Sequence, residues 1–310
     1  MGVFFSGNKS KKGISFFRYF FSIHFYKLLL IFILIHSHSI LSKEISTIVL
    51  DKDFQFTNLG EYLEVIEDKE NKITIDKILT EKLEWKEPVD KGINFGFNPN
   101  YFWVRFSILS KDRITEKPIL ELAFPRIDLI ELYRLKNGNY EKTVTGDLFP
   151  FKQREIEDTN FAFELEANNT KPETYYIRTR SLTNISFLNP RLYKSFTVFH
   201  KESSSRDLSN GLLYGFLLIM IFYNLLLFLI IREKVYFYLS FYILSFLLVL
   251  LSLHGISFQY FYPENTWLAN KENYFLIPIL LMIQIVFINS YLELKINLPV
   301  MYNFLRIHLL

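Results

Sequence analysis

The sequence lacks cysteine altogether, and its charged central region contains little glycine or histidine. The absence of cysteine excludes disulfide scaffolds, cysteine-ligated zinc sites, thiol nucleophiles and cysteine-held iron–sulfur clusters. The five glycines between residues 44 and 207 form no P-loop, dinucleotide-binding or nucleophile-elbow motif. Because His200 is the only histidine in that region, a Ser-His-Asp triad or a histidine metal site is not expected there. We therefore expect a protein that is not an enzyme and that uses no cofactor or metal.

Charge is distributed unevenly along the 310 residues. Residues 1–43 contain six Lys or Arg and no acidic residue, whereas residues 44–207 contain 24 basic and 28 acidic residues. Residues 208–310 contain only five basic and four acidic residues. A basic leader, a charged middle and an apolar tail are the layout of a membrane protein. The acidic excess of the middle argues against nucleic acid as a partner, because phosphate binding requires an excess of Lys and Arg.

The leader, residues 1–42, has the pattern of a secretory signal peptide. Basic residues precede the apolar run 28–35 (LLLIFILI), and small residues follow it. Eight helical residues span about 12 Å, far less than the roughly 30 Å of a bilayer core. A retained signal anchor over residues 16–41 is the alternative. Either interpretation exports the region that follows.

The tail, residues 208–310, is predicted to form a helical transmembrane domain. The stretches 208–231, 235–259 and 274–292 contain no Asp, Glu, Lys or Arg. Each approaches or exceeds the roughly 20 residues that a membrane helix needs, and residues 304–310 resemble the start of a fourth helix. We thus expect a multi-pass protein of the cell inner membrane. By the positive-inside rule, Arg232 and Lys234 place the first turn in the cytoplasm and the middle region in the periplasm.

The middle, residues 44–200, is predicted to be an all-β domain. Phe102, Val104 and Phe106 alternate with polar or bulky neighbours, so residues 102–109 read as a half-buried strand. Asn137-Gly138 predicts a hairpin. Residues 74–84 fit either a short helix or a turn, and residues 201–207 (KESSSRD) read as a polar hinge into the membrane. Short strands separated by turn signals predict an antiparallel sandwich, the other expected strands being 119–124, 127–135, 140–144, 161–165, 175–180 and 196–199.

Three stretches of the middle resemble a known bacterial module: 100–107 (NYFWVRFS), 124–133 (FPRIDLIELY) and 145–154 (TGDLFPFKQR). They look like the second type of extracellular domain of the seven-transmembrane receptors with diverse intracellular signalling modules. The tail resembles the membrane part of the same family, at 211–215 (GLLYG), 223–225 (YNL), 236–238 (YFY), 253–260 (LHGISFQY) and Trp267. The two resemblances follow each other in the family's own order and together cover roughly residues 47–305.

The resemblance implies a periplasmic, jelly-roll-like β-sandwich that binds carbohydrate or a similar small ligand. It also implies seven helices that relay ligand occupancy to a cytoplasmic output, such as a histidine kinase, a diguanylate cyclase or a phosphatase. The chain departs from that pattern, because it offers three helices and no output domain. Two interpretations follow: the chain is a truncated or split receptor, or it acts with a partner. The partner is then a separate signalling output protein or a second copy in a homo-oligomer.

Two candidate ligand-binding residues lie on the predicted strand 102–109. Trp103 and Arg105 face away from Phe102 and Val104 by alternation. An exposed Trp beside an Arg suits stacking on a sugar face and donation to its hydroxyls. The alternative is that Trp103 only covers the second sheet of the sandwich.

Four further candidates lie at strand ends or in loops, where binding residues concentrate. Arg126 and Asp128 follow Pro125 and either line a pocket or form a structural ion pair. Asp147 and Arg154 either contact the ligand or only form a turn. The sequence thus predicts a membrane sensor for a neutral or weakly charged small ligand, expected to be a saccharide. A membrane-tethered carbohydrate- or envelope-binding protein without signalling is the alternative.

Overall fold

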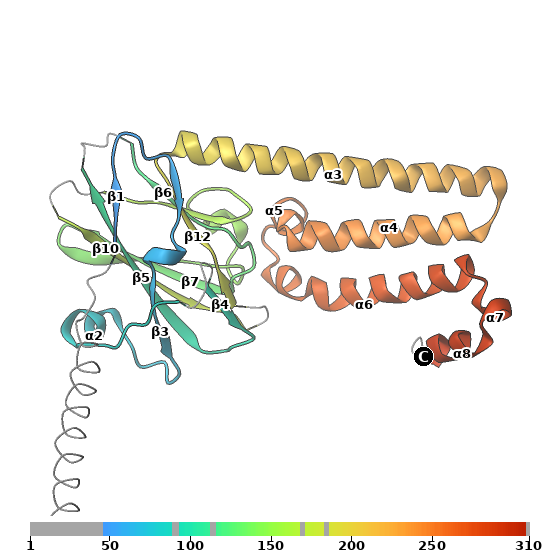
Figure 1. Cartoon of the computed structure of the whole chain (residues 1–310), viewed down its shortest axis with the longest axis horizontal. Coiled ribbons are helices and arrows are strands. Elements are labelled where there is room, and N and C mark those ends of the chain that lie inside the picture. The colour runs from blue at the N-terminus through green and yellow to red at the C-terminus, as the bar shows by residue number, and fades with distance from the viewer. Residues whose placement is uncertain (1–45, 89–92, 112–115, 168–170, 183–185, 308–310) are drawn as a thin grey trace, which may run out of the picture. The chain divides into compact units, whose positions relative to one another are not determined.

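The computed structural model describes residues 46–88, 93–111, 116–167, 171–182 and 186–307 (Figure 1). A strand-rich region comes first and long apolar helices follow, which confirms the predicted fold class. The predicted leader lies outside the described residues. The strands are β1 (Thr47–Leu50), β2 (Phe56–Asn58), β3 (Glu64–Asp68), β4 (Ile93–Gly96), β5 (Tyr101–Ser110), β6 (Ile119–Leu122), β7 (Leu129–Lys136), β8 (Asn139–Thr145), β9 (Phe161–Glu164), β10 (Glu173–Arg180), β11 (Ser186–Leu188) and β12 (Pro190–Tyr193).

The strands form a six-stranded, a four-stranded and a two-stranded sheet. The six-stranded sheet has the order β1-β5-β10-β7-β8, with β3 also paired to β5. The four-stranded sheet has the order β2-β12-β6-β9, and β11 pairs with β4. Among the described strands, neighbours are antiparallel except β1 and β5, which run parallel. The β7–β8 hairpin turns at Asn137 and Gly138, both at positive φ (51° and 84°), as the Asn-Gly signal predicts.

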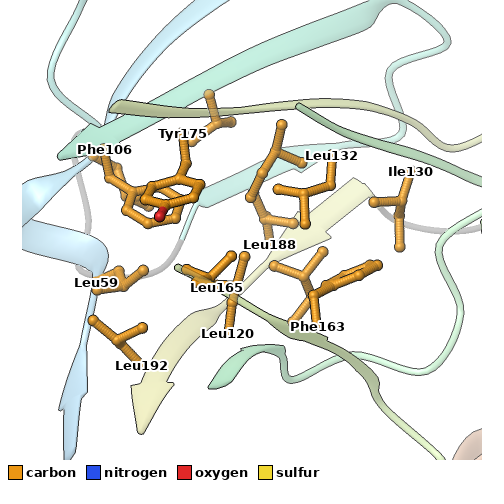
Figure 2. Close-up of a cluster of buried hydrophobic side chains, with 14 of the residues drawn as sticks. Leu59, Phe106, Leu120, Ile130, Leu132, Phe163, Leu165, Tyr175, Leu188 and Leu192 are labelled. Carbon is orange, nitrogen blue, oxygen red and sulfur yellow. The ribbon is translucent and has the colours of Figure 1, made fainter. Parts of the chain in front are cut away.

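The main hydrophobic core contains side chains from the six-stranded and the four-stranded sheet (Figure 2). Phe106 and Ile130 come from the six-stranded sheet, and Leu120 and Phe163 from the four-stranded one. All four are at most 1% exposed. Phe102, Val104, Phe106 and Ile108 all belong to this core, so the predicted core side of 102–109 is correct. The strand is not half-buried as predicted, because Trp103 and Ser107 on its other side are buried too.

A second, smaller core covers the opposite face of the six-stranded sheet. It contains Ile78 of the short helix α2 (Ile75–Thr80) and residues of the neighbouring loops, including Trp85. The Thr74 side chain caps α2 by accepting a hydrogen bond from the Lys77 backbone N–H (3.4 Å). For the stretch 74–84 the sequence allows a short helix or a turn. The structure has the helix α2 followed by a loop, and both cover this face of the six-stranded sheet.

Two sequence-based expectations near residue 200 are wrong. Residues 196–199, predicted as a strand, and residues 201–207, predicted as a hinge, both belong to the helix α3 (Phe196–Ile231). The last strand is β12 instead. Ser195 starts the helix by accepting a hydrogen bond from the Val198 backbone N–H (3.5 Å). Neither Gly nor Pro follows until Gly211, so nothing breaks the helix between the β domain and the apolar region.

The remaining helices are α4 (Lys234–Leu253), α5 (Ile256–Tyr260), α6 (Thr266–Tyr291), α7 (Leu294–Asn297) and α8 (Pro299–Ile307). Among the described residues, α3, α4 and α6 are the helices long and apolar enough to cross a membrane. Ile221 of α3 packs with Ile243 and Leu247 of α4. The Ser240 hydroxyl donates to the Ile221 carbonyl across the same pair of helices (3.4 Å).

Candidate functional site

The six residues predicted to bind ligand fall into two separate groups. The first group, Trp103 and Arg105, lies on β5. Trp103 is 0% exposed and packs against Tyr133 at a ring-centroid distance of 5.2 Å, so the exposed position expected for it is wrong. Arg105 donates from Nε to Glu64 (2.6 Å) and stacks over the Trp85 ring (4.2 Å). Both side chains therefore pack within the smaller core and loops that cover this face of the six-stranded sheet.

The second group lies where the β domain contacts the helices. We call this contact region the junction, formed by residues 121–128, 147–160, 206 and 252–273. Arg126 is buried and reaches the ends of α4 and α6. Its guanidinium donates to the Ala269 carbonyl (3.0 Å), the Ser252 hydroxyl (3.2 Å) and the Glu272 carboxylate (3.2 Å). Arg126 is thus a β-domain side chain whose cationic group is held by the helices.

Asp128 and Asp147 lie beside Arg126 and are both buried. The Asp128 carboxylate accepts a hydrogen bond from the Leu182 backbone N–H (2.6 Å). Gly146 brings the two acids together, because a Cβ there would lie 2.1 Å from the Asp128 carbonyl oxygen and its φ is +145°. The Asp147 carbonyl accepts from the Asn270 side chain of α6 (2.9 Å).

Burial dominates the electrostatics of Asp147. It raises the pKa of Asp147 to about 7, and the neighbouring Asp128 carboxylate adds to the rise. The positive charges of Arg126 and Arg154 act in the opposite direction, as does Asn270. Asp147 is therefore a group of the junction that changes its charge near neutral pH.

Arg154 occupies an aromatic pocket within the junction. It lies over the rings of Phe151 (4.4 Å), Phe161 (4.1 Å) and Phe258 of α5 (5.9 Å). The guanidinium also donates to the backbone carbonyls of Asp158 (2.8 Å) and Thr159 (2.7 Å). Burial lowers the pKa of Arg154 to about 9, so the side chain stays cationic at neutral pH.

Apolar and backbone contacts complete this side of the junction. Phe151, from the turn η3 (Phe151–Gln153), packs edge-on against Phe258 at 5.7 Å, and Ala269 belongs to the same cluster. The Phe151 backbone N–H donates to the Pro263 carbonyl (2.8 Å). Gly255, at φ +76°, ends the turn after α4, where an added Cβ would lie 3.0 Å from the Pro125 side chain.

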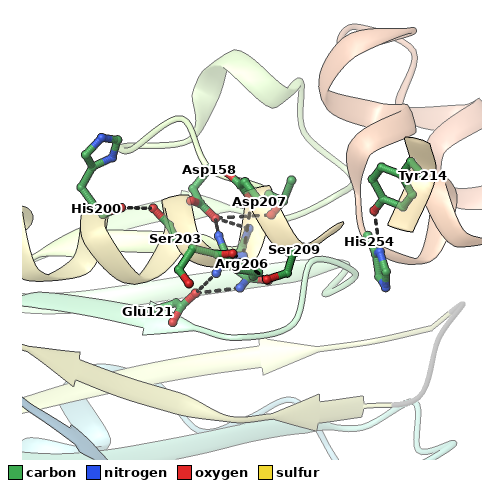
Figure 3. Close-up of polar contacts among 12 residues, drawn as sticks. Glu121, Asp158, His200, Ser203, Arg206, Asp207, Ser209, Tyr214 and His254 are labelled. Atoms are coloured by element: carbon green, nitrogen blue, oxygen red, sulfur yellow. Dashed lines mark hydrogen bonds and ion pairs between the residues drawn. The ribbon is translucent and has the colours of Figure 1, made fainter. Parts of the chain in front are cut away.

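A second polar contact joins the β domain to the helices, and here the arginine comes from α3 (Figure 3). Arg206 donates to Glu121 of β6 (2.7 Å) and to Asp158 (2.6 Å). Glu121 is 0% exposed and also accepts from the Tyr193 hydroxyl (2.8 Å) and the Asn160 side chain (2.7 Å). Burial raises the pKa of Asp158, while the charge of Arg206 opposes the rise. This network fixes the first turns of α3 to the four-stranded sheet.

Sequence reasoning missed Glu121, Arg206, Asn270 and Glu272. One signal was available for Glu121, because it is a charge inside the otherwise apolar run 119–122 (ILEL). Glu272 had a weaker signal, since it lies just before the uncharged stretch that begins at residue 274. Within the part of the chain that the structure describes, no cluster of three His, Asp or Glu residues could hold a metal ion. The geometry suits mechanical coupling between the β domain and the helices.

The fold and the junction define a class of protein, in which a β domain is fixed to membrane helices as in a receptor. Two family models match the chain: 7TMR-DISM extracellular 2 over residues 60–189, and 7TM diverse intracellular signalling over residues 206–310. The chain belongs to this family of seven-transmembrane signalling receptors, which confirms the resemblance seen in the sequence. Among curated proteins, none matches the chain.

Proposed function

We propose that this membrane receptor senses a small ligand with its β domain and passes the change to its helices through the junction. The observation that carries the proposal is the reciprocal pair of arginines. Arg126 extends from the β domain to the helices, and Arg206 extends from α3 to Glu121 of the β domain. Each arginine belongs to one region and has its charged group held by the other.

Buried polar contacts of this kind support coupling rather than simple tethering. Removing one partner of a buried ion pair costs about 3–5 kcal/mol, because it leaves an uncompensated charge behind. A movement of the β domain that keeps both pairs therefore has to move the helix ends with it. A protein that only tethers a binding domain needs no such contacts. Signalling further requires two conformations that bind the ligand with different affinity.

The orientation and the ligand are part of the proposal. We place the β domain in the periplasm and the helices in the inner membrane, supported by the signal-like leader and by Arg232 and Lys234 in the first turn. The ligand is a small molecule, for which the family resemblance suggests carbohydrate. The output acts on the cytoplasmic side, and the family membership favours a sensor without catalysis of its own.

The proposal is tested with a reporter at the far end of α3. The Cys-free chain allows a single spin label at Glu233→Cys, an exposed position in the turn between α3 and α4. The full chain is reconstituted in lipid nanodiscs, with Arg126→Ala and Arg206→Ala as junction variants. Arg180→Ala is the matched control, because Arg180 contacts Tyr101 and the Pro99 carbonyl away from the junction.

We expect the spectrum of the label to change in both junction variants and to stay the same in Arg180→Ala. Thermal unfolding of each variant shows that the comparison is made between folded proteins. An unchanged spectrum in folded Arg126→Ala and Arg206→Ala would support the tethering alternative instead.

A further inference from the structure

The side-chain carboxyl group of Asp147 is buried in the junction without a hydrogen-bond donor. Asp147 is 3% exposed, and neither of its carboxylate oxygens accepts a hydrogen bond from a described residue. The Asn270 side chain of α6 lies beside it but donates to the backbone carbonyls of Asp147 and Thr266 (2.9 Å each). A buried carboxylate without donors is unfavourable when ionised, because burial removes the water that stabilises its charge. The arrangement of the structure therefore suits a protonated Asp147.

The backbone holds this carboxyl group close to two charged residues of the β domain. The Asp147 backbone N–H donates to the Ile127 carbonyl (2.8 Å), and Ile127 lies between Arg126 and Asp128 in the chain. Gly146 has φ +145°, and a Cβ added there would overlap the Asp128 carbonyl oxygen. The two segments are thus packed too closely for Asp147 to move away from Asp128.

The charges around Asp147 place its titration near neutral pH. Among the described residues, Asp128, Arg126 and Arg154 are the charged groups that act on it, and Asn270 is the polar one. Burial raises the pKa of Asp147 to about 7, the Asp128 carboxylate adds to the rise, and the two arginines oppose it. Asp147 therefore gains a negative charge beside two cations when the medium becomes neutral.

Arg126 connects this titration to the helices. Its guanidinium donates to the Ala269 carbonyl (3.0 Å) and to the Glu272 carboxylate (3.2 Å), both on α6. Ala269 is followed by Asn270, which contacts Asp147, so Arg126 and Asp147 meet the same turn of α6. A negative charge on Asp147 attracts the guanidinium and competes with Glu272 for it.

We propose that the junction is a switch operated by a proton on Asp147. The protonated residue leaves Arg126 with Glu272, so the β domain and α6 are held together. The ionised residue draws Arg126 towards the β domain, which weakens the contact with α6. Acidification of the medium around the β domain restores that contact. The inference adds regulation to the proposed function and rests on it, because the junction has to pass the change on to the helices.

The inference is tested on the full chain in nanodiscs, by titrating the label at Glu233→Cys between about pH 5 and about pH 9. We expect its spectrum to change with a midpoint near pH 7. Asp147→Asn keeps the shape and the neutral charge of the protonated residue, so it should show the low-pH spectrum throughout. Asp76→Asn is the matched control, because Asp76 is exposed on α2, and it should titrate like the parent chain.

His254 is a second group near the helix ends that titrates close to neutral pH. It shares a hydrogen bond with the Tyr214 hydroxyl (2.6 Å). His254→Gln removes this titration and should keep the transition near pH 7. A transition that persists in Asp147→Asn and disappears in His254→Gln would assign the switch to His254 and overturn the inference.

Infrared difference spectra of the same samples report the proton itself. The parent chain should lose the band of a protonated carboxyl group around pH 7, and Asp147→Asn should lack that loss. A spectrum of the label that does not depend on pH, or the absence of the band, overturns the inference. If Arg126→Ala changes the label whereas pH does not, the proposed coupling stands and the switch is wrong. If the band titrates and neither pH nor Arg126→Ala changes the label, the proposed function fails, and the switch fails with it.

Discussion

Arg206 of α3 lies 2.7 Å from the carboxylate of Glu121, a β6 residue that is completely buried. A helix that continues into the membrane region thereby supplies the neutralising charge for an acid inside the β domain. Folding of the β domain and placement of α3 consequently depend on each other.

Removing Arg206 should destabilise the protein strongly. Arg206→Ala leaves Glu121 buried with only the more distant Arg191 (3.8 Å) as a cation. We expect a loss of about 3 kcal/mol, at the low end of the effect of breaking a buried pair, because the Arg206 side chain is 26% exposed. Urea unfolding of the full chain in detergent micelles measures the loss. Lys201→Ala, an exposed position of the same helix, should change the midpoint little; equal losses in the two variants would contradict the assignment.

Removing Arg126 should open the other side of the junction. Arg126→Ala leaves the buried Glu272 carboxylate without its ion-pair partner. The backbone hydrogen bond from Phe151 to Pro263 should then break more often. Hydrogen–deuterium exchange should show faster exchange in peptides that cover residues 149–154, with little change in the β7–β8 hairpin. Uniformly faster exchange over the whole β domain would indicate global destabilisation rather than local opening.

Asp147 should make stability depend on pH. Its pKa is about 7 in the folded protein, well above the ordinary value of 3.8, so the folded state retains a proton that the unfolded chain has lost. Its contribution is therefore most favourable below about pH 4 and declines as the pH rises towards 7. Asp128, Arg126 and Arg154 are the charged groups that face it. In Asp147→Asn, unfolding measured between pH 4 and 8 should show a smaller decline than the parent chain; identical slopes would contradict this assignment.

Trp103 should behave as a core residue. Because its side chain is completely buried, Trp103→Ala should cost about 3–5 kcal/mol. Trp103→Phe keeps the contact with Tyr133 and should cost less. Chemical unfolding of the full chain provides both values. A Trp103→Ala variant of parental stability that binds ligand more weakly would instead support a direct role in the site.

Cysteine labelling can test the proposed orientation. Lys152, Glu233, Glu264 and Lys295 are exposed, and the parent chain has no cysteine. In intact spheroplasts, an impermeant maleimide should label Lys152→Cys and Glu264→Cys from the periplasm. It should not label Glu233→Cys or Lys295→Cys until the membrane is permeabilised. Labelling of Glu233→Cys before permeabilisation would reverse the topology.

The sequence predicts the core side of the strands better than it predicts what covers their outer side. Alternation along β5 identifies Phe102 and Val104 as core residues, because the period of a strand is a local property. The burial of Trp103 depends on residues 73–85, and that of Glu121 on α3, which are distant in the chain. Such tertiary contacts leave no periodic signal in the sequence.

Residues 196–199 illustrate a different difficulty. A short apolar run fits a strand as well as a buried helical turn. The capping role of Ser195 and the absence of Gly or Pro up to residue 210 were the signals that favoured a helix. For the candidate site, the sequence named Arg126, Asp128, Asp147 and Arg154 as separate candidates. It predicted neither that they lie together nor which helix residues contact them. Whether these residues bind ligand stays a prediction.

The uninterrupted helix α3 has a consequence for the size of any signal. Its 36 residues extend over about 54 Å, nearly twice the thickness of a bilayer core. Arg206 holds α3 ten residues after its start at Phe196, so about 38 Å of helix lie beyond this contact. A tilt of about 5° around this contact would displace Ile231, at the opposite end, by about 3 Å. A small rotation of α3 at the β domain is thus converted into a displacement of about 3 Å at the opposite end of the helix.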